Sequence, residues 1–286
     1  MHLPRDSALM KRIRLIPFAL PLLLAPLLSA GETPAVKPDA ITGLICFWDF
    51  SEPAGTARIA RGAQPSALQE MKGPVEREAG GPFGFAARIK KGQWLAIPRK
   101  DCGALDLHGK DARVTVVAWI KRASASAWQS IGGVWDESRS KRQYFLFVSA
   151  TSLTDSRTMT RSPAKDRVHG HVSAVGGATP GEKYCITYSS GATAVPLNEW
   201  VMVAMSYDGQ FSRAYLNGKL DALEHSNPFP YADGLFDGGV DGADFTVGSN
   251  SVGGKPSNFF DGWIGGLAIY NRALSDDELI SLHSRR

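Results

Sequence analysis

One stretch near the C-terminus, residues 259–275, constrains the fold of this chain more than any other. In an extended conformation its central residues fall alternately on two sides, and both sides are apolar or small. One side carries Trp263, Gly265, Leu267 and Ile269, and the other carries Ile264, Gly266, Ala268 and Tyr270. The pattern predicts a strand that is buried on both faces.

A short helix is predicted directly after this strand. Ser275 can cap its first turn, and Glu278, three residues later, completes a capping box. Acidic side chains at this point suit the positive end of the helix dipole. Apolar residues then give the helix one apolar side: Leu279, Ile280 and Leu282.

Most of the remaining chain reads as strands joined by turns. Residues 111–122 alternate most clearly, and residues 200–207 lead into Asp208-Gly209, a tight-turn signal before a returning strand. The other predicted strands cover residues 44–50, 67–71, 75–78, 85–89, 128–135, 143–149, 168–175, 183–188 and 211–216. Residues 151–166 are polar and without a period, so we expect a long surface loop there. These features indicate an all-β fold, a two-sheet antiparallel jelly-roll sandwich with one short C-terminal helix.

Three motifs resemble those of laminin-G-like domains, which are concanavalin A-like jelly rolls. They are the closing strand with Tyr-Asn-Arg-Ala-Leu and Ser-x-x-Glu, the strand Val-Thr-Val-Val-Ala-Trp-Ile-Lys, and the pattern Trp-x-x-Val-Ala-x-x-Tyr-Asp-Gly with a later Tyr-Leu-Asn-Gly. The resemblance extends from about Leu44 to Leu282, and it implies the same sandwich. Family members often read Ile-Asp-Glu where this chain reads Ile264-Gly265-Gly266, so two carboxylates are absent from this strand.

Residues 1–30 have the layout of a secretory signal peptide. Lys11, Arg12 and Arg14 precede an apolar run over residues 15–28, and small residues follow it. An uncleaved anchor is the alternative, but the run is short for a membrane span and contains three prolines. We therefore predict a leader over 1–30, a flexible lead-in over 31–42 and the jelly-roll domain over 43–286. The expected location is secreted or periplasmic, with no lipidation cysteine and no membrane span after cleavage.

The formal net charge of +4 comes mostly from this leader, which holds four basic residues and one acidic residue. The remaining chain therefore offers no electrostatic case for nucleic acid as a partner. Export permits a disulfide, but the number of cysteines, three, is odd. Cys46 lies in an apolar strand and is expected to be buried, which leaves Cys102 and Cys185 as the better candidates for a pair, if any pair forms.

A glycosidase on such a sandwich needs two carboxyl groups about 5 Å apart, one as nucleophile and one as acid. Strands supply such pairs at positions i and i+2 or i+4, and none of the predicted strands has them. Asp136 and Glu137 are adjacent in a turn, and the acids of the C-terminal helix serve its cap. The sequence therefore indicates a protein that is not an enzyme.

His169 and His171 share one face of a predicted strand, which is a geometry that can hold a transition metal. A third ligand at a legible spacing is missing, so two partly exposed strand histidines are the simpler interpretation. Polysaccharide lyases on jelly rolls use His and Tyr with Arg or Gln, and Tyr184 and Arg167 could complete such a set. The motifs of those lyases are absent.

Sugar-binding sites in such folds stack sugar rings on exposed aromatic side chains. The candidates for ligand binding are Trp128, Trp135, Tyr144, Tyr184 and Tyr188. Four other tryptophans fit buried strand patterns and are assigned to the core: Trp48, Trp119, Trp200 and Trp263.

A run of aspartates among glycines, residues 231–248, is the candidate metal site. Ca²⁺ prefers several oxygen ligands on a flexible loop, and laminin-G-like domains often bind calcium on the sandwich rim. The candidate ligands are Asp237, Asp241 and Asp244, with Asp233 nearby. A run of ordinary Asp-Gly turns is the alternative.

We thus expect a secreted, non-catalytic recognition module that binds a glycan or a cell-surface protein, assisted by calcium if the Asp-rich run binds it. This expectation rests on the fold-level resemblance and on the absence of a catalytic set. Two alternatives stay open. One is a glycan-degrading hydrolase or lyase on the same sandwich, and the other is a structural envelope or adhesion protein.

Overall fold

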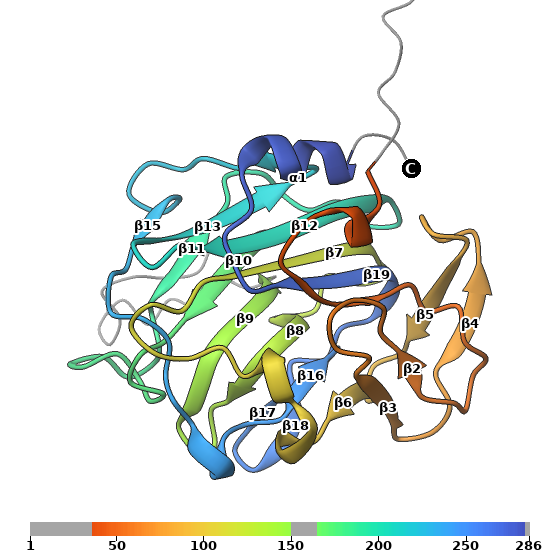
Figure 1. The fold of residues 1–286 in the computed structure, drawn as a ribbon, viewed down its shortest axis with the longest axis horizontal. Helices are drawn as coiled ribbons and strands as arrows, with labels where there is room; N and C mark the ends of the chain where they lie inside the picture. Colours follow the sequence, from red (N-terminus) through yellow and green to blue (C-terminus); the bar gives the residue numbers. More distant parts are fainter. Residues whose placement is uncertain (1–35, 150–164, 284–286) are drawn as a thin grey trace, which may run out of the picture. The chain divides into compact units, whose positions relative to one another are not determined.

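The structure is a computed structural model that describes residues 36–149 and 165–283. Its fold consists of two sheets packed face to face (Figure 1). The strands, in chain order, are β1 (Leu44–Trp48), β2 (Arg58–Ile59), β3 (Ala67–Met71), β4 (Glu76–Ala79), β5 (Phe85–Ile89), β6 (Trp94–Ile97), β7 (Val114–Arg122), β8 (Gln129–Asp136), β9 (Lys141–Ser149), β10 (Arg167–Val172), β11 (Tyr188–Ser190), β12 (Trp200–Tyr207), β13 (Phe211–Leu216), β14 (Lys219–Leu220), β15 (Phe229–Pro230), β16 (Phe245–Val247), β17 (Asn250–Val252), β18 (Lys255–Ser257) and β19 (Gly262–Tyr270). The helical elements are η1 (Pro38–Ala40), η2 (Arg99–Asp101), η3 (Gly103–Leu105), η4 (Gly239–Asp241) and α1 (Asp276–His283).

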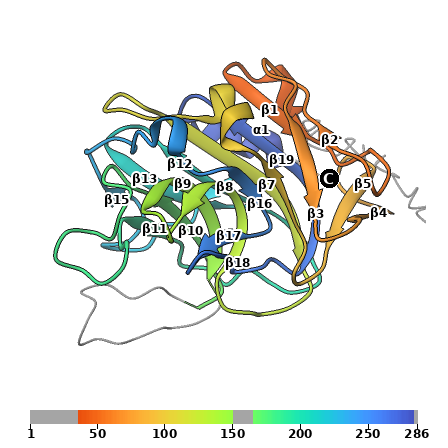
Figure 2. The same ribbon diagram turned by 90° about the horizontal axis from the view of Figure 1, so that it is seen from below.

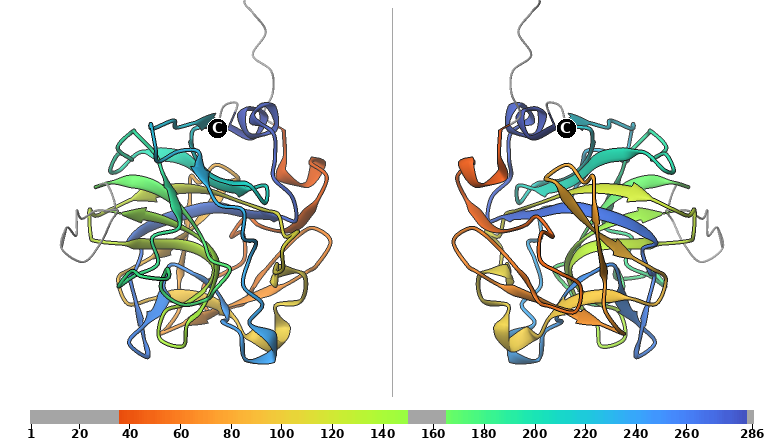
Figure 3. Two further views of the ribbon diagram at one scale, coloured as in Figure 1. Left: turned by 90° about the vertical axis from the view of Figure 1, so that its left-hand side faces the viewer. Right: turned by 90° about the vertical axis from the view of Figure 1, so that its right-hand side faces the viewer.

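Each sheet combines strands from distant parts of the chain. Sheet I runs β14-β13-β12-β7-β19-β5-β4, with β1 beside β19 and β15 beside β13. Sheet II runs β11-β10-β9-β8-β16-β6-β3-β2, with β17 beside β8 and β18 beside β17. Nearly all pairs are antiparallel, and the sheets form two layers when seen from the side (Figures 2 and 3). The expected all-β jelly-roll sandwich is confirmed.

Apolar side chains fill the space between the layers because the strands alternate as the sequence pattern requires. Sheet I contributes Val114, Val116, Ala118 and Ile120 of β7 to this core. Sheet II contributes Ile131, Val134, Tyr144, Leu146 and Val148 of β8 and β9.

The closing strand β19 is buried as predicted, but its simple alternation is interrupted. A β-bulge lies between Ile264 and Gly266 where β19 pairs with β7. The extra residue moves Ile264 to the same core as Leu267 and Ile269, whereas the alternation placed them on opposite sides.

The outer face of sheet I is covered by α1 and by the first described residues. Ser275 and Glu278 form the expected capping box, with each side chain accepting a hydrogen bond from the other residue's main-chain nitrogen. Leu279 and Leu282 pack into a second apolar cluster with residues of β1, β7, β12 and β19. Figure 1 shows α1 along this side of the molecule.

Several sequence expectations need correction. Residues 183–187 are not strand, because β11 begins only at Tyr188 and the preceding segment makes turns. Trp48 and Trp119 are buried, but Trp200 and Trp263 are only half-buried on the outer face of sheet I. The ammonium of Lys121 lies 4.2 Å from the ring centroid of Trp263 and 5.4 Å from that of Trp200, so a basic side chain covers these rings in place of apolar core. The predicted leader and most of the predicted loop over 151–166 lie outside the described residues.

Candidate functional site

Two cross-strand rows of side chains stand on the outer face of sheet II. Strand alternation sends Val168 and Val172 of β10 into the core, so the histidines between them face outward. The first row across β9, β10 and β11 consists of Phe145, His171 and Tyr188. The second row consists of Phe147, His169 and Ser190. The predicted common face of the two histidines is therefore confirmed. Both side chains are buried, however, so the interpretation as partly exposed histidines is wrong.

Two tryptophans extend these rows into one cluster. We name it the aromatic–histidine cluster, and it comprises Trp128, Trp135, Phe145, Phe147, His169, His171 and Tyr188. The His171 ring lies at its centre. Its centroid is 5.5 Å from that of Trp128, 5.4 Å from that of Trp135, 4.9 Å from that of Phe147 and 4.6 Å from that of Tyr188.

Trp128 differs from the other members in its exposure and its backbone. It is half-buried at the margin of the cluster, directly before β8, and its ring contacts Phe147 and His169 edge-on. Its φ is 47°, a left-handed conformation that is strained for a large aromatic residue. Such strain persists where the surroundings impose it, and here the conformation holds the indole against the cluster.

A charged pair flanks the cluster beside Trp135. The Arg142 guanidinium lies 5.9 Å from the Trp135 ring centroid and 3.6 Å from the Glu137 carboxylate. Glu137 also accepts hydrogen bonds from Trp135 Nε1 and Asn250 Nδ2. Asp136, its neighbour, accepts from the Arg139 side chain and main chain. Both turn acids are therefore engaged in holding the β8–β9 turn.

The structure separates the five aromatic candidates. Trp128, Trp135 and Tyr188 come together in the cluster, but Trp135 and Tyr188 are buried and are not exposed stacking surfaces. Tyr144 is buried in the core between the sheets, where its hydroxyl donates to the Leu105 carbonyl, so the expectation of an exposed stacking surface there is wrong. Tyr184 is 44% exposed, next to Lys183 and outside the cluster.

Sequence reasoning missed Phe145 and Phe147 as members of the site. Both alternate along β9 with the core residues Tyr144, Leu146 and Val148. This alternation was the sequence signal that placed them on the outer face of the strand. The signal was hard to use because β9 is apolar on both faces.

The Asp-rich run, residues 231–248, contains η4, and two of its aspartates form hydrogen bonds with nearby main-chain groups. Asp237 accepts a hydrogen bond from the Gly239 main chain, and Asp244 accepts one from the Arg99 main chain. The Arg99 guanidinium donates to the Gly239 carbonyl. Within residues 36–149 and 165–283, no three His, Cys, Asp or Glu side chains are grouped so that they could hold a metal ion.

All three cysteines are free thiols. Cys46 is buried as expected, and its thiol donates to the Gln64 carbonyl. The suggested pair of Cys102 and Cys185 is wrong because the two residues lie on opposite faces of sheet II. Cys102 belongs to the core, where burial raises the pKa of its thiol to about 11, whereas Cys185 packs against the aromatic–histidine cluster.

The sequence matches the family described as the concanavalin A-like lectin/glucanases superfamily over residues 91–280, more than half of the chain. The chain belongs to this superfamily. Membership agrees with the laminin-G-like resemblance of its motifs. No curated protein matches the sequence significantly. Among the described residues, no helix has both the length and the apolar character needed to cross a membrane.

Solved structures with the same fold come from several kinds of protein. Domain 4 of AbnA, a GH43 extracellular arabinanase from Geobacillus stearothermophilus in complex with arabinotriose, matches with a TM-score of 0.57 and 16% identity, over 84% of this chain and 98% of that domain. A Trypanosoma rangeli sialidase matches with a TM-score of 0.53 and 15% identity, over 85% of this chain but only 33% of the sialidase. The binding domain of botulinum neurotoxin DC, in complex with rat synaptotagmin II, matches with a TM-score of 0.50 and 11% identity, over 84% of this chain and 51% of that domain. At these identities the likeness shows the fold alone.

Proposed function

We propose that this superfamily member is a secreted, non-catalytic recognition module that binds a glycan on the outer face of sheet II, at the exposed edge of Trp128. The observation that carries the proposal is the aromatic–histidine cluster, which holds a strained, half-exposed indole at its margin. Aromatic rings stack on the C–H faces of sugars, and Trp128 is the member of the cluster whose ring is partly exposed. Complexes of the fold with arabinotriose and with a protein receptor support a recognition role only at the level of the fold.

The contacts of the nearby acids support a role without catalysis. A glycosidase needs one ionised and one protonated carboxyl group at a defined separation across the ligand. Glu137 is bonded to Trp135 and Asn250, and Asp136 is paired with Arg139, so both support the turn. Purified protein is expected to release no reducing ends from β-glucans and no unsaturated products from uronic-acid polymers. Release that disappears in Glu137→Ala would establish an enzyme.

A glycan array, followed by calorimetry on the best ligand, tests the proposal. Trp128→Ala is expected to weaken binding about tenfold or more, because it removes an aromatic contact surface. Tyr184→Ala is the matched control, since Tyr184 is an exposed aromatic residue outside the cluster. Equal affinities for Trp128→Ala and the parent protein, at unchanged melting temperature, would contradict the proposed site. Binding of a cell-surface protein in place of any glycan would contradict the proposed ligand.

Calcium assistance is a separate proposal, which rests on Asp237, Asp241 and Asp244 in the rim loop. Weak extracellular calcium sites have Kd values on the order of 10⁻⁴–10⁻³ M. A ligand that binds only the folded state raises the melting temperature. We expect millimolar Ca²⁺ to raise the melting temperature of the parent protein. Mg²⁺ should not raise it, and Ca²⁺ should not raise it in Asp241→Asn. Identical melting curves with calcium and with chelator would leave these residues with a turn-forming role alone.

A further inference from the structure

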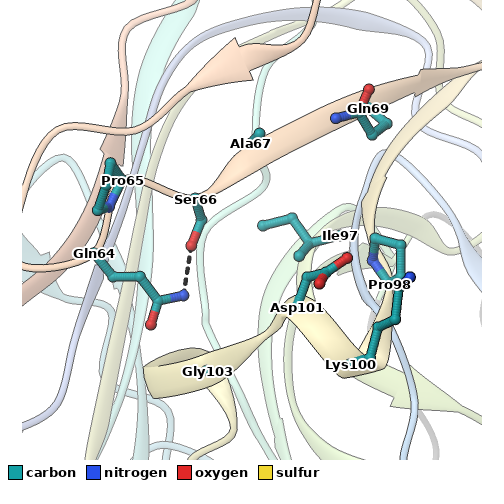
Figure 4. Close-up of a pocket in the computed structure, with 10 residues that line it drawn as sticks. All are labelled: Gln64, Pro65, Ser66, Ala67, Gln69, Ile97, Pro98, Lys100, Asp101 and Gly103. Carbon is teal, nitrogen blue, oxygen red and sulfur yellow. Dashed lines mark hydrogen bonds between the residues drawn. The ribbon is translucent and has the colours of Figure 1, made fainter.

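Sheet II carries a second feature, a hollow at the end opposite the aromatic–histidine cluster. The hollow has a volume of about 520 Å³ and lies between the start of β3 and the turn after β6 (Figure 4). In the strand order, β16 and β6 separate β3 from β8. Three strand spacings of about 4.8 Å place β3 roughly 14 Å from β8. The hollow is therefore a separate place on the molecule.

Gln64 makes the walls of this hollow rigid. Its amide nitrogen donates to Ser66 Oγ at 2.6 Å and to the Cys102 carbonyl at 2.9 Å, and its amide oxygen accepts from the Ala104 main chain at 2.7 Å. A Cβ atom on Gly103, whose φ is 52°, would lie 2.4 Å from the Gln64 amide oxygen. Two loops that are far apart in the sequence are thus held at a defined separation before any ligand arrives.

Three polar side chains around the hollow are available to hydrogen-bond a ligand. Gln69, Lys100 and Asp101 are exposed. In the part of the chain that the structure describes, their side chains form no hydrogen bond or ion pair with other residues. Pro65, Ala67, Ile97 and Pro98 also line the hollow and supply apolar groups (Figure 4). Such a mixture of apolar floor and a few polar groups is typical of small-molecule sites.

The charges at the hollow limit the ligand that it can take. Lys100 only donates hydrogen bonds, an ionised Asp101 only accepts them, and the Gln69 amide does both. An anionic ligand meets Asp101 and a cationic ligand meets Lys100, so each is opposed by one of the two. Sugar hydroxyls both donate and accept, and they carry no charge. The volume is also within the range of about 300–1,000 Å³ for small-molecule pockets.

We propose that this hollow is a second carbohydrate site that binds one or two neutral sugar rings through Gln69, Lys100 and Asp101. The proposal extends the proposed glycan-recognition function, but it depends on different residues, so the two can fail independently. With few hydrogen bonds and no aromatic platform, the Kd is expected to be on the order of 1 mM.

The test uses the full chain labelled with ¹⁵N and titrated with glucose, galactose and arabinose. Binding at the hollow is expected to shift the main-chain amides of residues 64, 66–69, 97 and 99–103 for at least one of these sugars. Asp101→Ala is expected to weaken that binding about tenfold, because a hydrogen bond to a charged group is lost. Asp111→Ala is the matched control, since Asp111 is also an exposed aspartate but does not line the hollow. Glucuronate and glucosamine are expected to bind more weakly than glucose.

The outcomes separate the hollow from the cluster. Sugar-dependent shifts at the hollow that survive Trp128→Ala and decline in Asp101→Ala and Gln69→Ala would support the proposal. The absence of shifts at the hollow with every sugar, or equal binding by Asp101→Ala and Asp111→Ala, would overturn it. If no sugar binds at the hollow but Trp128→Ala still abolishes glycan binding, the proposed function stands and only the second site is excluded. Tighter binding of glucuronate than of glucose would overturn the neutral class of ligand.

Discussion

At the scale of single residues, Gly265 and Gly266 occupy the positions where the laminin-G-like resemblance led us to expect two acids in the closing strand. A Cβ atom on Gly265 would lie 2.4 Å from Pro82 Cδ, and one on Gly266 would lie 2.6 Å from the Phe83 ring. The segment before β5 lies directly against these glycines, so no side chain fits. The packing of this segment therefore leaves no room for an acidic side chain at either position.

Substituting Gly266 tests this explanation. Gly266→Ala is expected to destabilise the protein by about 1–3 kcal/mol, because the methyl group overpacks a filled contact with Phe83. Gly177→Ala is the control, since its Cβ would meet its nearest neighbour at an ordinary 3.8 Å. Urea unfolding measures both. Equal stability of the two variants would show that the Phe83 ring moves aside freely.

The capping box makes a second residue-scale prediction, about pH. The hydrogen bond from Arg272 lowers the pKa of Glu278 from its usual 4.5 to about 2, and the bond from the Ser275 main chain acts in the same direction. Because the pKa is lower in the folded state, the charged form of Glu278 stabilises the fold above about pH 4.5, and this contribution is lost as the pH falls toward 2.

Glu278→Gln is therefore expected to lower the free energy of unfolding by about 1 kcal/mol at pH 7, an amount that allows for solvent screening of a partly exposed pair. The difference from the parent protein should shrink between pH 4.5 and 2, the interval spanned by the two pKa values. Glu76→Gln, which breaks a more exposed pair with Lys90, is expected to have a smaller effect. A difference that stays constant with pH would mean that the ionisation of Glu278 is not responsible.

At the scale of elements, Arg122 joins the end of β7 to three other segments. Its side chain is fully buried, and its guanidinium donates to Gln129 Oε1, to the Val195 carbonyl and to Asp166 Oδ1. The three bonds run to the start of β8, to the segment before β12 and to the segment before β10. One side chain thus holds together the ends of strands from both sheets.

Arg122→Met tests how much this junction contributes. The substitution leaves Asp166 and the Val195 carbonyl without their partner, so a loss of about 3–5 kcal/mol is expected. Asp166→Asn keeps an acceptor for the guanidinium and is expected to cost less. Calorimetric unfolding compares the two variants. A Met variant as stable as the parent would show that apolar packing replaces the ionic junction without loss.

At the scale of the whole molecule, export remains a prediction from the N-terminal sequence. Lys11 to Arg14, the apolar run and the small residues at Ser29 and Ala30 favour cleavage before Gly31. In a secreting host, N-terminal sequencing of the exported protein should begin near Gly31. Arg12→Glu together with Arg14→Glu is expected to reduce export, because the basic region is lost. Exported protein that still begins at Met1 would contradict a cleaved leader.

The fold class followed from local patterns because a sandwich is built from periods that neighbouring residues express. The alternation of β7, the Asp208-Gly209 turn and the capping box at Ser275 and Glu278 each depend on a few adjacent residues. All three were predicted from the sequence alone. The one-residue bulge in β19 was not, because it arises where β19 pairs with β7 and moves Ile264 to the other side.

The sites depended on tertiary structure, because register and strand order bring distant residues together. Trp128 and Trp135 were recognisable as aromatic candidates, but only the pairing of β8 to β11 places them around His171. Tyr144 differs from Phe145 by one position, and that position decides between the core and the outer face. The hollow beside Gln64 joins loops about forty residues apart, a distance over which no local pattern reports contact.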